Sequence, residues 1–339
     1  MLNHSLSFLN TWKNKRTIQE EKKLGFERSS RSRRFSPRTL FFSAPSASFQ
    51  SPLVAIDRNT NDPIITQIQL TGDSGVLNTY MAGYSAYQLD PGPLEPSVLT
   101  QQLTHRSQDI WDGNVNMILN MRRCDGNFWD LVKKYPIHPR VLEVIELSGL
   151  YGVYRSNRPS IDRSLITSLV ERWRPETHTF HFRTGEATIT LQDVEVLYDL
   201  PVNGDPVLGD ESIRTIGDWQ NICQRLLGFI PRPQDFNRSS LKVTALNAHM
   251  LEQLQLPDLA TQDMINQMAR CYMFWMIAGM MMADTSGNYL KLMFLHMLED
   301  LNVVSSYSWG SATLACLYRF LCKASQSNQN EIAGFLPLL

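Results

Sequence analysis

The chain has 339 residues, of which 43% are hydrophobic and 19% are charged, and its formal net charge is −1. This length accommodates two average domains or one large one, and the composition allows a sizeable core. Residues 1–40 hold ten Lys and Arg against three Glu, whereas the remaining chain holds 22 basic and 30 acidic residues. The main body is therefore mildly acidic, which excludes the general electrostatic footprint of a nucleic-acid-binding domain.

The cysteine content and the apolar runs indicate an intracellular protein that does not span a membrane. The number of cysteines is odd and no C-x-x-C pair occurs, which favours reduced thiols over a disulfide framework. The longest apolar run, Cys271–Ala283, has 13 residues, whereas a membrane helix needs roughly 20. This run therefore predicts a buried core helix.

Residues 1–60 show little hydrophobic pattern, and the stretch 28–52 is rich in Ser, Arg and Pro. A disordered arm is the favoured interpretation. An organelle transit peptide is a second interpretation, against which the acidic residues around Glu20 argue. The third is a nuclear localisation signal in residues 13–16 or 31–34, because both are short basic runs.

Turn-forming residues then mark a domain boundary. Residues 61–97 contain Thr71-Gly72-Asp73-Ser74-Gly75 and later Asp90-Pro91-Gly92-Pro93, which is typical of a linker. We therefore divide the chain into a basic, Ser-rich disordered extension and linker, 1–85, and a globular domain, 89–339.

The first half of the domain predicts helices interrupted by one hairpin. Pro139 and Gly149 bound a helix over 139–148. Apolar residues at helical spacing predict a second helix over 161–173, which Pro175 ends. Alternating residues over 178–190 predict a β-hairpin, and a Thr190–Asp193 capping box opens a helix over 191–200.

The last third of the chain predicts three helices, over 261–283, 289–301 and 308–324. Nine of the fourteen methionines fall between Met264 and Met297. Methionine fills irregular gaps in cores and is also common on adaptable binding surfaces. Core packing is the favoured interpretation, and a Met-lined partner groove is the alternative.

Motifs that would indicate chemistry are missing from the sequence. His178 and His181 lie three apart in a predicted strand, so they point to opposite faces and do not suggest a metal pair. The glycine turn 204–210 has no Lys-Ser/Thr partner for phosphate. Lys242 and Lys291 follow no glycine-rich turn, which argues against a pyridoxal phosphate site. We therefore predict no catalytic, cofactor-binding or metal-ligating residues.

Several ordered blocks of sequence resemble one family, the plant mobile domain. The longest is Leu165–His181, which includes Trp173-Arg174-Pro175-Glu176-Thr177. The other matching blocks are Gly185-Glu186, Thr188–Val194, Leu200–Gly204, His105-Arg106-Ser107 with Ile110-Trp111, Leu298–Leu301, Tyr307–Ala312, Leu314 and Leu317-Tyr318. The resemblance covers about three quarters of the chain and begins near Leu89.

The resemblance implies a plant protein of the MAINTENANCE OF MERISTEMS (MAIN-like) group, some of whose members are named phosphatase 7 long form homolog or aminotransferase-like. It implies a nuclear protein of meristem maintenance, gene expression and transposable-element silencing. Its partners would be nuclear proteins, including a phosphatase 7-type protein or chromatin factors. No catalytic residue is established for the family, and the phosphatase metal motifs do not occur here. The signature positions of unknown role are Trp173, Arg174, Pro175, Glu176, Thr177 and Trp309.

Two departures from the family pattern lead to further expectations. Residues 1–85 differ from the usual family N-terminus. The chain stops at the apolar segment Phe335–Leu339, where family members continue, so we expect a domain truncated at its C-terminus with apolar surface exposed.

The predicted fold is mainly α, a multi-helix globular domain with a small β-hairpin inserted, and three functions compete for it. The favoured one is a non-catalytic nuclear interaction module. The alternative is a transposon-derived DNA-binding accessory domain, in which a winged-helix-like unit places Arg172, Arg174 and Arg183 near DNA. Against it, the local net charge is near zero, since Glu171, Glu176 and Glu186 can pair with these arginines. A cryptic enzyme is the least favoured.

Overall fold

The computed structural model describes residues 54–56, 63–65, 97–113, 118–210, 212–254 and 260–339. Its internal contacts divide the chain into two units, Met1–Ser85 and Ala86–Leu339. In the first unit, β1 (Val54–Ile56) pairs antiparallel with β2 (Pro63–Ile65). Most of the predicted disordered arm, its targeting signals and most of the linker lie outside the described residues.

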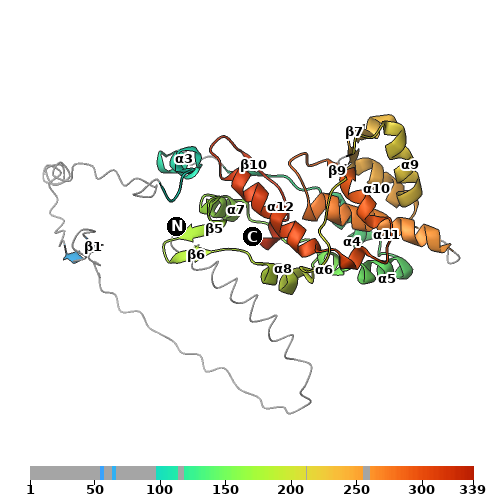
Figure 1. The fold of residues 1–339 in the computed structure, drawn as a ribbon, viewed down its shortest axis with the longest axis horizontal. Coiled ribbons are helices and arrows are strands. Elements are labelled where there is room, and N and C mark those ends of the chain that lie inside the picture. The colour runs from blue at the N-terminus through green and yellow to red at the C-terminus, as the bar shows by residue number, and fades with distance from the viewer. Residues whose placement is uncertain (1–53, 57–62, 66–96, 114–117, 211, 255–259) are drawn as a thin grey trace, which may run out of the picture. The chain divides into compact units, whose positions relative to one another are not determined.

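The second unit is mainly helical, as predicted (Figure 1). Its α-helices are α3 (Ser107–Trp111), α4 (Gly126–Lys134), α5 (Pro139–Leu147), α6 (Tyr151–Arg155), α7 (Arg163–Val170), α8 (Leu191–Tyr198), α9 (Ile216–Leu227), α10 (Val243–Glu252), α11 (Gln262–Met276) and α12 (Trp309–Ala324). Short 3-10 or π segments are η1 (Gln102–Thr104), η2 (Pro233–Asp235), η3 (Ile277–Met281), η4 (Leu292–Leu298), η5 (Val304–Ser306) and η6 (Leu336–Leu338).

The second unit also contains three small sheets. The predicted hairpin is confirmed as β5 (Thr179–Phe182) and β6 (Gly185–Ala187), and β4 (Trp173–Arg174) adds a third antiparallel strand. A second antiparallel sheet has the order β7 (Phe236–Asn237), β8 (Ser240–Lys242) and β9 (Tyr289–Lys291). In the third, β3 (Asn120–Met121) and β10 (Glu331–Ile332) pair in parallel.

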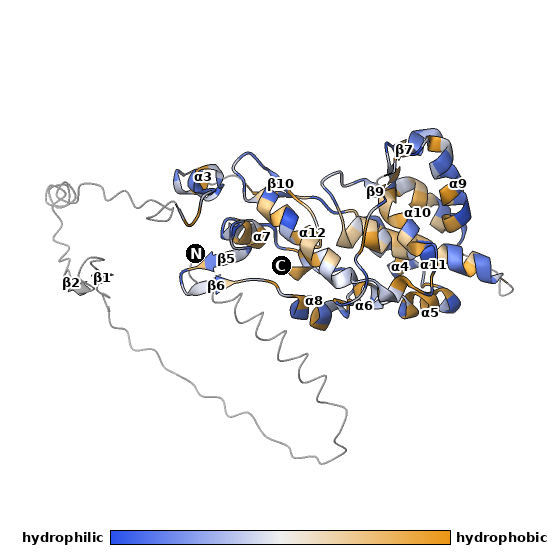
Figure 2. Cartoon of the chain, viewed as in Figure 1, coloured by the Kyte–Doolittle hydropathy of each residue, from blue (hydrophilic) through white to orange (hydrophobic). Residues whose placement is uncertain are grey.

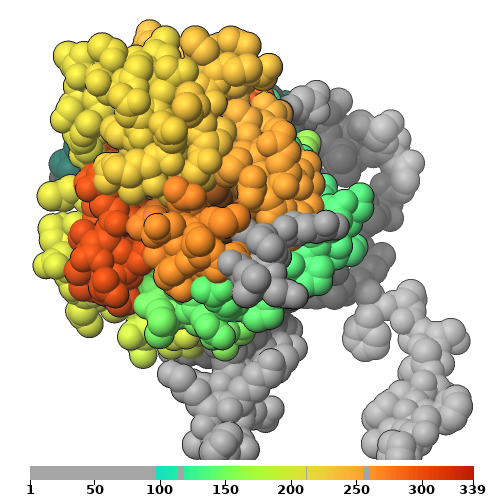
Figure 3. Space-filling view, turned by 90° about the vertical axis from the view of Figure 1, so that its right-hand side faces the viewer, coloured from blue at the N-terminus to red at the C-terminus, as the bar shows by residue number. Residues whose placement is uncertain are grey.

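The core is built around α11 and its continuation η3, a π-helical turn that forms the last part of the helix predicted over 261–283. Phe128 from α4 packs edge-to-face on Trp275 from α11, with ring centroids 5.6 Å apart. Helices α5, α9 and α10 contact α11 as well. Figure 3 views this end of the domain, where α9 and α10 (yellow to gold) lie against the orange segment that contains α11. Figure 2 shows that α5 and α9 each have a hydrophobic and a hydrophilic side.

The methionine-rich stretch packs inside this core. Seven of the nine methionines between Met264 and Met297 are buried, and the other two are half-buried. Core packing is therefore confirmed, and the alternative of a Met-lined partner groove is wrong. Within the described residues no helix is long and apolar enough to cross a membrane.

Helix termini that carry strong local signals lie where the sequence predicts them. Pro139 opens α5, whose preceding His138 accepts a hydrogen bond from the Arg140 amide at 3.2 Å. Thr190 and Asp193 form the predicted capping box of α8. Each cap satisfies amide groups that a helix leaves unpaired in its first turn.

Two predicted helices are wrong in part. Helix α7 covers Arg163–Val170 and not 161–173, because Trp173–Arg174 become strand β4 and pair with β5. Pro175 supplies a local reason, since a residue that precedes proline avoids the helical region. Residues 289–301 hold β9 and the 3-10 segment η4 instead of an α-helix, because Leu290 pairs with Leu241 of β8.

Candidate functional site

The signature tryptophan of β4 is a core residue that ties the hairpin to α12. Trp173 has no exposed surface. Its ring packs edge-to-face on Phe180 and Tyr318, at centroid distances of 4.9 and 5.0 Å. Its indole Nε1 donates to Cys322 Sγ at 3.3 Å. The side chain therefore joins three elements and presents no group to solvent.

Arg174 and Glu176 hold a segment that comes before them in the chain. Arg174 Nη1 donates to Gln102 Oε1 at 2.6 Å, and Glu176 Oε1 accepts from the Gln101 amide at 2.7 Å. Burial lowers the pKa of Arg174, and the nearby Glu176 carboxylate opposes that shift. Arg174 Nε and Glu176 Oε2 are buried without a hydrogen-bond partner in the described part of the chain. Sequence reasoning missed Gln101 and Gln102, although the neighbouring His105-Arg106-Ser107 motif was a signal.

The His105-Arg106-Ser107 motif is attached to the same place. The Ser107 amide donates to His105 Nδ1 at 3.1 Å, so the other ring nitrogen, Nε2, donates to the Trp173 carbonyl at 2.8 Å. Burial lowers the pKa of His105 to about 4, and the Arg174 charge adds to this shift. Arg106 is 1% exposed, and its amide donates to the Ser325 carbonyl at 2.8 Å.

The remaining turn residues, Pro175 and Thr177, contribute a bend and an exposed polar face. Pro175 lies in the turn between β4 and β5. Thr177 Oγ1 is 2.7 Å from Thr179 Oγ1 and 3.2 Å from His181 Nε2, and the His181 ring also faces Glu186 at 3.6 Å. His178 lies apart, 5.5 Å from the Tyr318 ring. No cluster of three metal-ligating side chains occurs within the residues that the structure describes.

Trp309 belongs to a second signature block, Tyr307–Ala312, which is hydrogen-bonded to a third, Leu200–Gly204. The Trp309 indole donates to the Val304 carbonyl at 2.8 Å. The amide of Gly310 donates to the Pro201 carbonyl at 2.7 Å, and Ser311 Oγ donates to the Val202 carbonyl at 2.7 Å. The blocks Leu200–Gly204 and Tyr307–Ala312, widely separated in sequence, are therefore joined by hydrogen bonds to main-chain carbonyls of the first block.

The order and spacing of these blocks match a known family. The sequence model of the Plant mobile domain matches residues 149–339. Relatives align over a longer stretch, which reaches about three quarters of the chain.

This chain belongs to the plant mobile domain family.

Three Arabidopsis thaliana proteins illustrate the relationship. Serine/threonine-protein phosphatase 7 long form homolog is 39% identical over 75% of this chain and 18% of its own length. Protein MAIN-LIKE 1 is 36% identical over 74% of this chain and 48% of its own length. Protein MAINTENANCE OF MERISTEMS is 34% identical over 71% of this chain and 48% of its own length. The matched region is thus less than half of each relative. No solved structure matches the chain.

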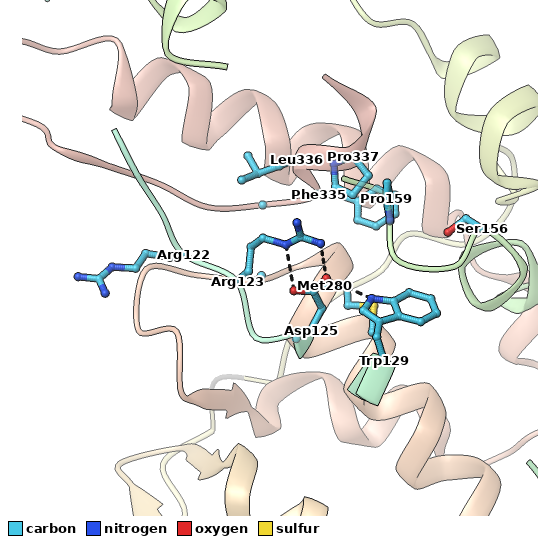
Figure 4. Close-up of a pocket in the computed structure, with 13 residues that line it drawn as sticks. Arg122, Arg123, Asp125, Trp129, Ser156, Pro159, Met280, Phe335, Leu336 and Pro337 are labelled. Carbon is cyan, nitrogen blue, oxygen red and sulfur yellow. Dashed lines mark hydrogen bonds and ion pairs between the residues drawn. The ribbon is translucent and has the colours of Figure 1, made fainter. Parts of the chain in front are cut away.

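This plant mobile domain has a small cavity beside the π-helical turn η3 (Figure 4). Asp125 lies in its wall, pairs with Arg123 and accepts from Trp129 Nε1 at 3.1 Å. The cavity volume is about 20 Å³, which is room for about one water molecule. A substrate of ordinary size does not fit there.

The apolar C-terminal segment forms another wall of this cavity. Phe335 and Leu336 are buried, and the Phe335 ring contacts Tyr198 at a centroid distance of 4.7 Å. Tyr198 OH donates to the Pro337 carbonyl at 3.1 Å. The segment therefore packs against α8, and its own apolar side chains add little to the exposed surface.

Three buried cysteines of the described residues have thiols that are not activated as nucleophiles. Burial raises the pKa of Cys124 and of Cys223 to about 12 and raises the pKa of Cys271 as well. A thiol with a raised pKa stays protonated at neutral pH and is a poor nucleophile. Lys291 Nζ lies 3.4 Å from Asp284 Oδ2 in an ion pair.

The three arginines considered for DNA contact are not equivalent. Arg172 and Arg183 are exposed, whereas Arg174 is buried and bound to Gln102. Helix α7, the three-stranded sheet and α8 follow one another as the winged-helix hypothesis requires, but that unit presents one arginine fewer than expected.

Proposed function

We propose that this chain is a non-catalytic binding module that acts in the nucleus through protein partners. By its family, we place it in meristem maintenance, gene expression and transposable-element silencing. The name of the relative MAINTENANCE OF MERISTEMS supports the developmental part of this role. The proposed partners are nuclear proteins, including chromatin factors or a phosphatase 7-type protein, as the name of another relative suggests.

One observation carries the non-catalytic part of the proposal. The polar groups of the signature residues bind the protein's own chain: Arg174 and Glu176 bind Gln102 and Gln101, and the Trp309 indole binds the Val304 carbonyl. Catalytic groups need a position from which they reach a substrate. The signature therefore specifies a scaffold, and recognition is left to surfaces that the scaffold displays.

A fluorescent fusion and an affinity purification from plant nuclei test the proposal. We expect the full chain to accumulate in nuclei and to recover chromatin proteins or a phosphatase. The matched control is the full chain with Leu241→Asp, which places a charge at a fully buried position and so unfolds the scaffold. Recovery of the same proteins by both chains, or of no nuclear protein by the native chain, contradicts a specific binding module.

DNA binding is the second candidate, and the two exposed arginines beside the three-stranded sheet favour it. Binding to duplex DNA at micromolar concentration should weaken with salt, with a slope of about −0.9 per phosphate contact. Replacement of both Arg172 and Arg183 by Ala should abolish that binding. Salt-independent or undetectable binding eliminates this candidate.

A further inference from the structure

The segment Leu99–Trp111, which we call the strap, is attached to the domain in an unusual way. It contains η1 and α3, and neither of these helical turns buries a single residue. Leu103 is 95% exposed and Trp111 is 48% exposed. Figure 1 shows α3 at the edge of the domain. Apolar packing of its helical turns therefore does not hold the strap in place.

Main-chain hydrogen bonds hold the strap at three points, as they hold a bound peptide. The Gln101 amide donates to Glu176, the Arg106 amide donates to the Ser325 carbonyl, and the Thr104 carbonyl accepts from the Ser327 amide at 2.8 Å. His105 forms a β-bridge with Gln326. Peptides that bind by strand addition use the same kind of main-chain contact, while pockets for alternate side chains give specificity.

The buried side chains of the strap are Leu99, His105 and Arg106, and two of these three are polar. His105 is 3% exposed and donates to the Trp173 carbonyl. Arg106 is 1% exposed, and its Nη1 lies 3.5 Å from the Ala324 carbonyl. The Glu171 carboxylate is close enough to raise the pKa of Arg106 against the lowering that burial causes. The site around Arg106 thus offers a carbonyl and a carboxylate to one guanidinium group.

Leu99 is the one apolar side chain that the strap buries, so release exposes less apolar surface than release of an apolar segment would. Opening returns His105 and Arg106 to water, and solvation offsets the contacts that they lose. In the closed state Arg174 Nε and Glu176 Oε2 are buried without a partner in the described part of the chain. Opening hydrates these two atoms, and elements with few buried apolar contacts open below the global unfolding free energy.

We infer that the strap is a displaceable internal ligand of a peptide-binding groove. The groove lies between the Trp173–Glu176 segment and the end of α12 with residues 324–327. Its ligand is an extended peptide whose arginine takes the position of Arg106, preceded by a histidine that donates to Trp173 O. The inference rests on the proposed function for the existence of such a ligand in a partner protein.

Hydrogen exchange of the unmodified full chain tests the opening. The Gln101, Arg106 and Ser327 amides should exchange together, and about 100-fold or more faster than buried α11 amides such as that of Trp275. Exchange of these three amides at the α11 rate would mean that the strap leaves only on global unfolding, and would overturn the inference.

A peptide added in trans tests the groove. The probe is a labelled synthetic peptide of residues 97–113, and fluorescence anisotropy measures its binding. It should bind the full chain with Arg106→Ala at least tenfold more tightly than the native chain, whose own strap competes. The matched control is the same peptide with Arg106→Ala, which should lose at least tenfold in affinity.

A second full-chain variant covers the case in which the Arg106→Ala chain does not fold. Gln102→Ala removes the contact to Arg174 and a hydrogen bond to Ser107 Oγ within the strap, and it should likewise raise peptide affinity over the native chain. If the folded variants bind the peptide no better than the native chain does, the groove is not a peptide site. That result does not contradict the proposed function. If instead the peptide binds as expected but the purification from nuclei recovers no nuclear protein, only the proposed function is contradicted.

Discussion

The Gly310 amide donates to the Pro201 carbonyl at 2.7 Å, and this contact joins two signature blocks. A Cβ on Gly310 would lie 2.9 Å from the Val202 side chain and 3.1 Å from the carbonyls of Leu200 and Pro201. On Gly204, at a φ of +124°, it would lie 2.0 Å from the Ser306 carbonyl. The two blocks can approach so closely only because both positions are glycine.

Substitution of these glycines should therefore destabilise the domain. We expect Gly204→Ala and Gly310→Ala each to lower the free energy of unfolding by roughly 1–3 kcal/mol, through overpacking. Gly217→Ala is the matched control, because a Cβ there meets only Thr215 Oγ1 at 3.7 Å and lies in the first turn of α9. Urea denaturation measures the stability of all three variants. Equal urea midpoints for Gly204→Ala and Gly217→Ala would contradict the close packing of the two signature blocks.

Removal of the Trp173 side chain should be costly. Trp173→Ala leaves a cavity among Phe180, Tyr318 and Cys322 and should cost roughly 3–5 kcal/mol. Trp111→Ala, in the strap, should cost far less because that side chain is 48% exposed. Chemical denaturation followed by circular dichroism compares the two, and similar losses would show that Trp173 is not a core residue.

Acidification should destabilise the domain through His105. The folded pKa, about 4, lies below the ordinary value of 6.5, so the unfolded state binds more protons between these values. The stabilisation is therefore fully present above pH 6.5 and is lost as the pH falls from 6.5 to 4, up to about 3 kcal/mol. His105→Gln, which keeps a donor towards Trp173 O, should reduce the difference between urea midpoints at pH 7 and pH 5. If His105→Gln leaves the difference between the two urea midpoints unchanged, His105 is not the source of the pH dependence. His181→Gln, on the three-stranded sheet, is the control.

The ion pair beside the small cavity should matter more than a similar pair on the surface. Asp125 is 5% exposed and accepts hydrogen bonds from Arg123 and Trp129. Asp125→Ala leaves these donors without their acceptor and should cost roughly 3–5 kcal/mol. Glu331→Gln, which weakens the exposed pair with Arg122, should leave the melting midpoint nearly unchanged. Differential scanning calorimetry measures the melting midpoints of both variants. Similar decreases in the two midpoints would show that the burial of Asp125 does not make its ion pair more stabilising.

Elements whose signals are local were predictable. Pro139, the Thr190–Asp193 capping box and the turn Arg183–Glu186 each act within a few residues, so α5, α8 and the hairpin follow from the sequence. Helix α9 carries the same kind of signal, a Thr215–Asp218 capping box with Gly228 at its end, and could have been found in this way.

The candidate site was only partly predictable. Its signature positions, among them Trp173 and Trp309, follow from the family resemblance, but their partners do not. The strap residues Gln101 and Gln102 carry no pattern that relates them to Glu176 and Arg174. Their contacts come from residues far apart in the chain, which no local periodicity records.

What the sequence determined by itself is the helical composition of the domain, its hairpin and its family, because caps, periodicity and motif order are local or linear properties. Tertiary structure alone decided that Trp173 pairs with Phe180, that β3 pairs with β10, and that the strap covers the signature turn. Each of these depends on burial and on hydrogen bonds between distant segments, and those free energies exceed the local preferences of a few residues.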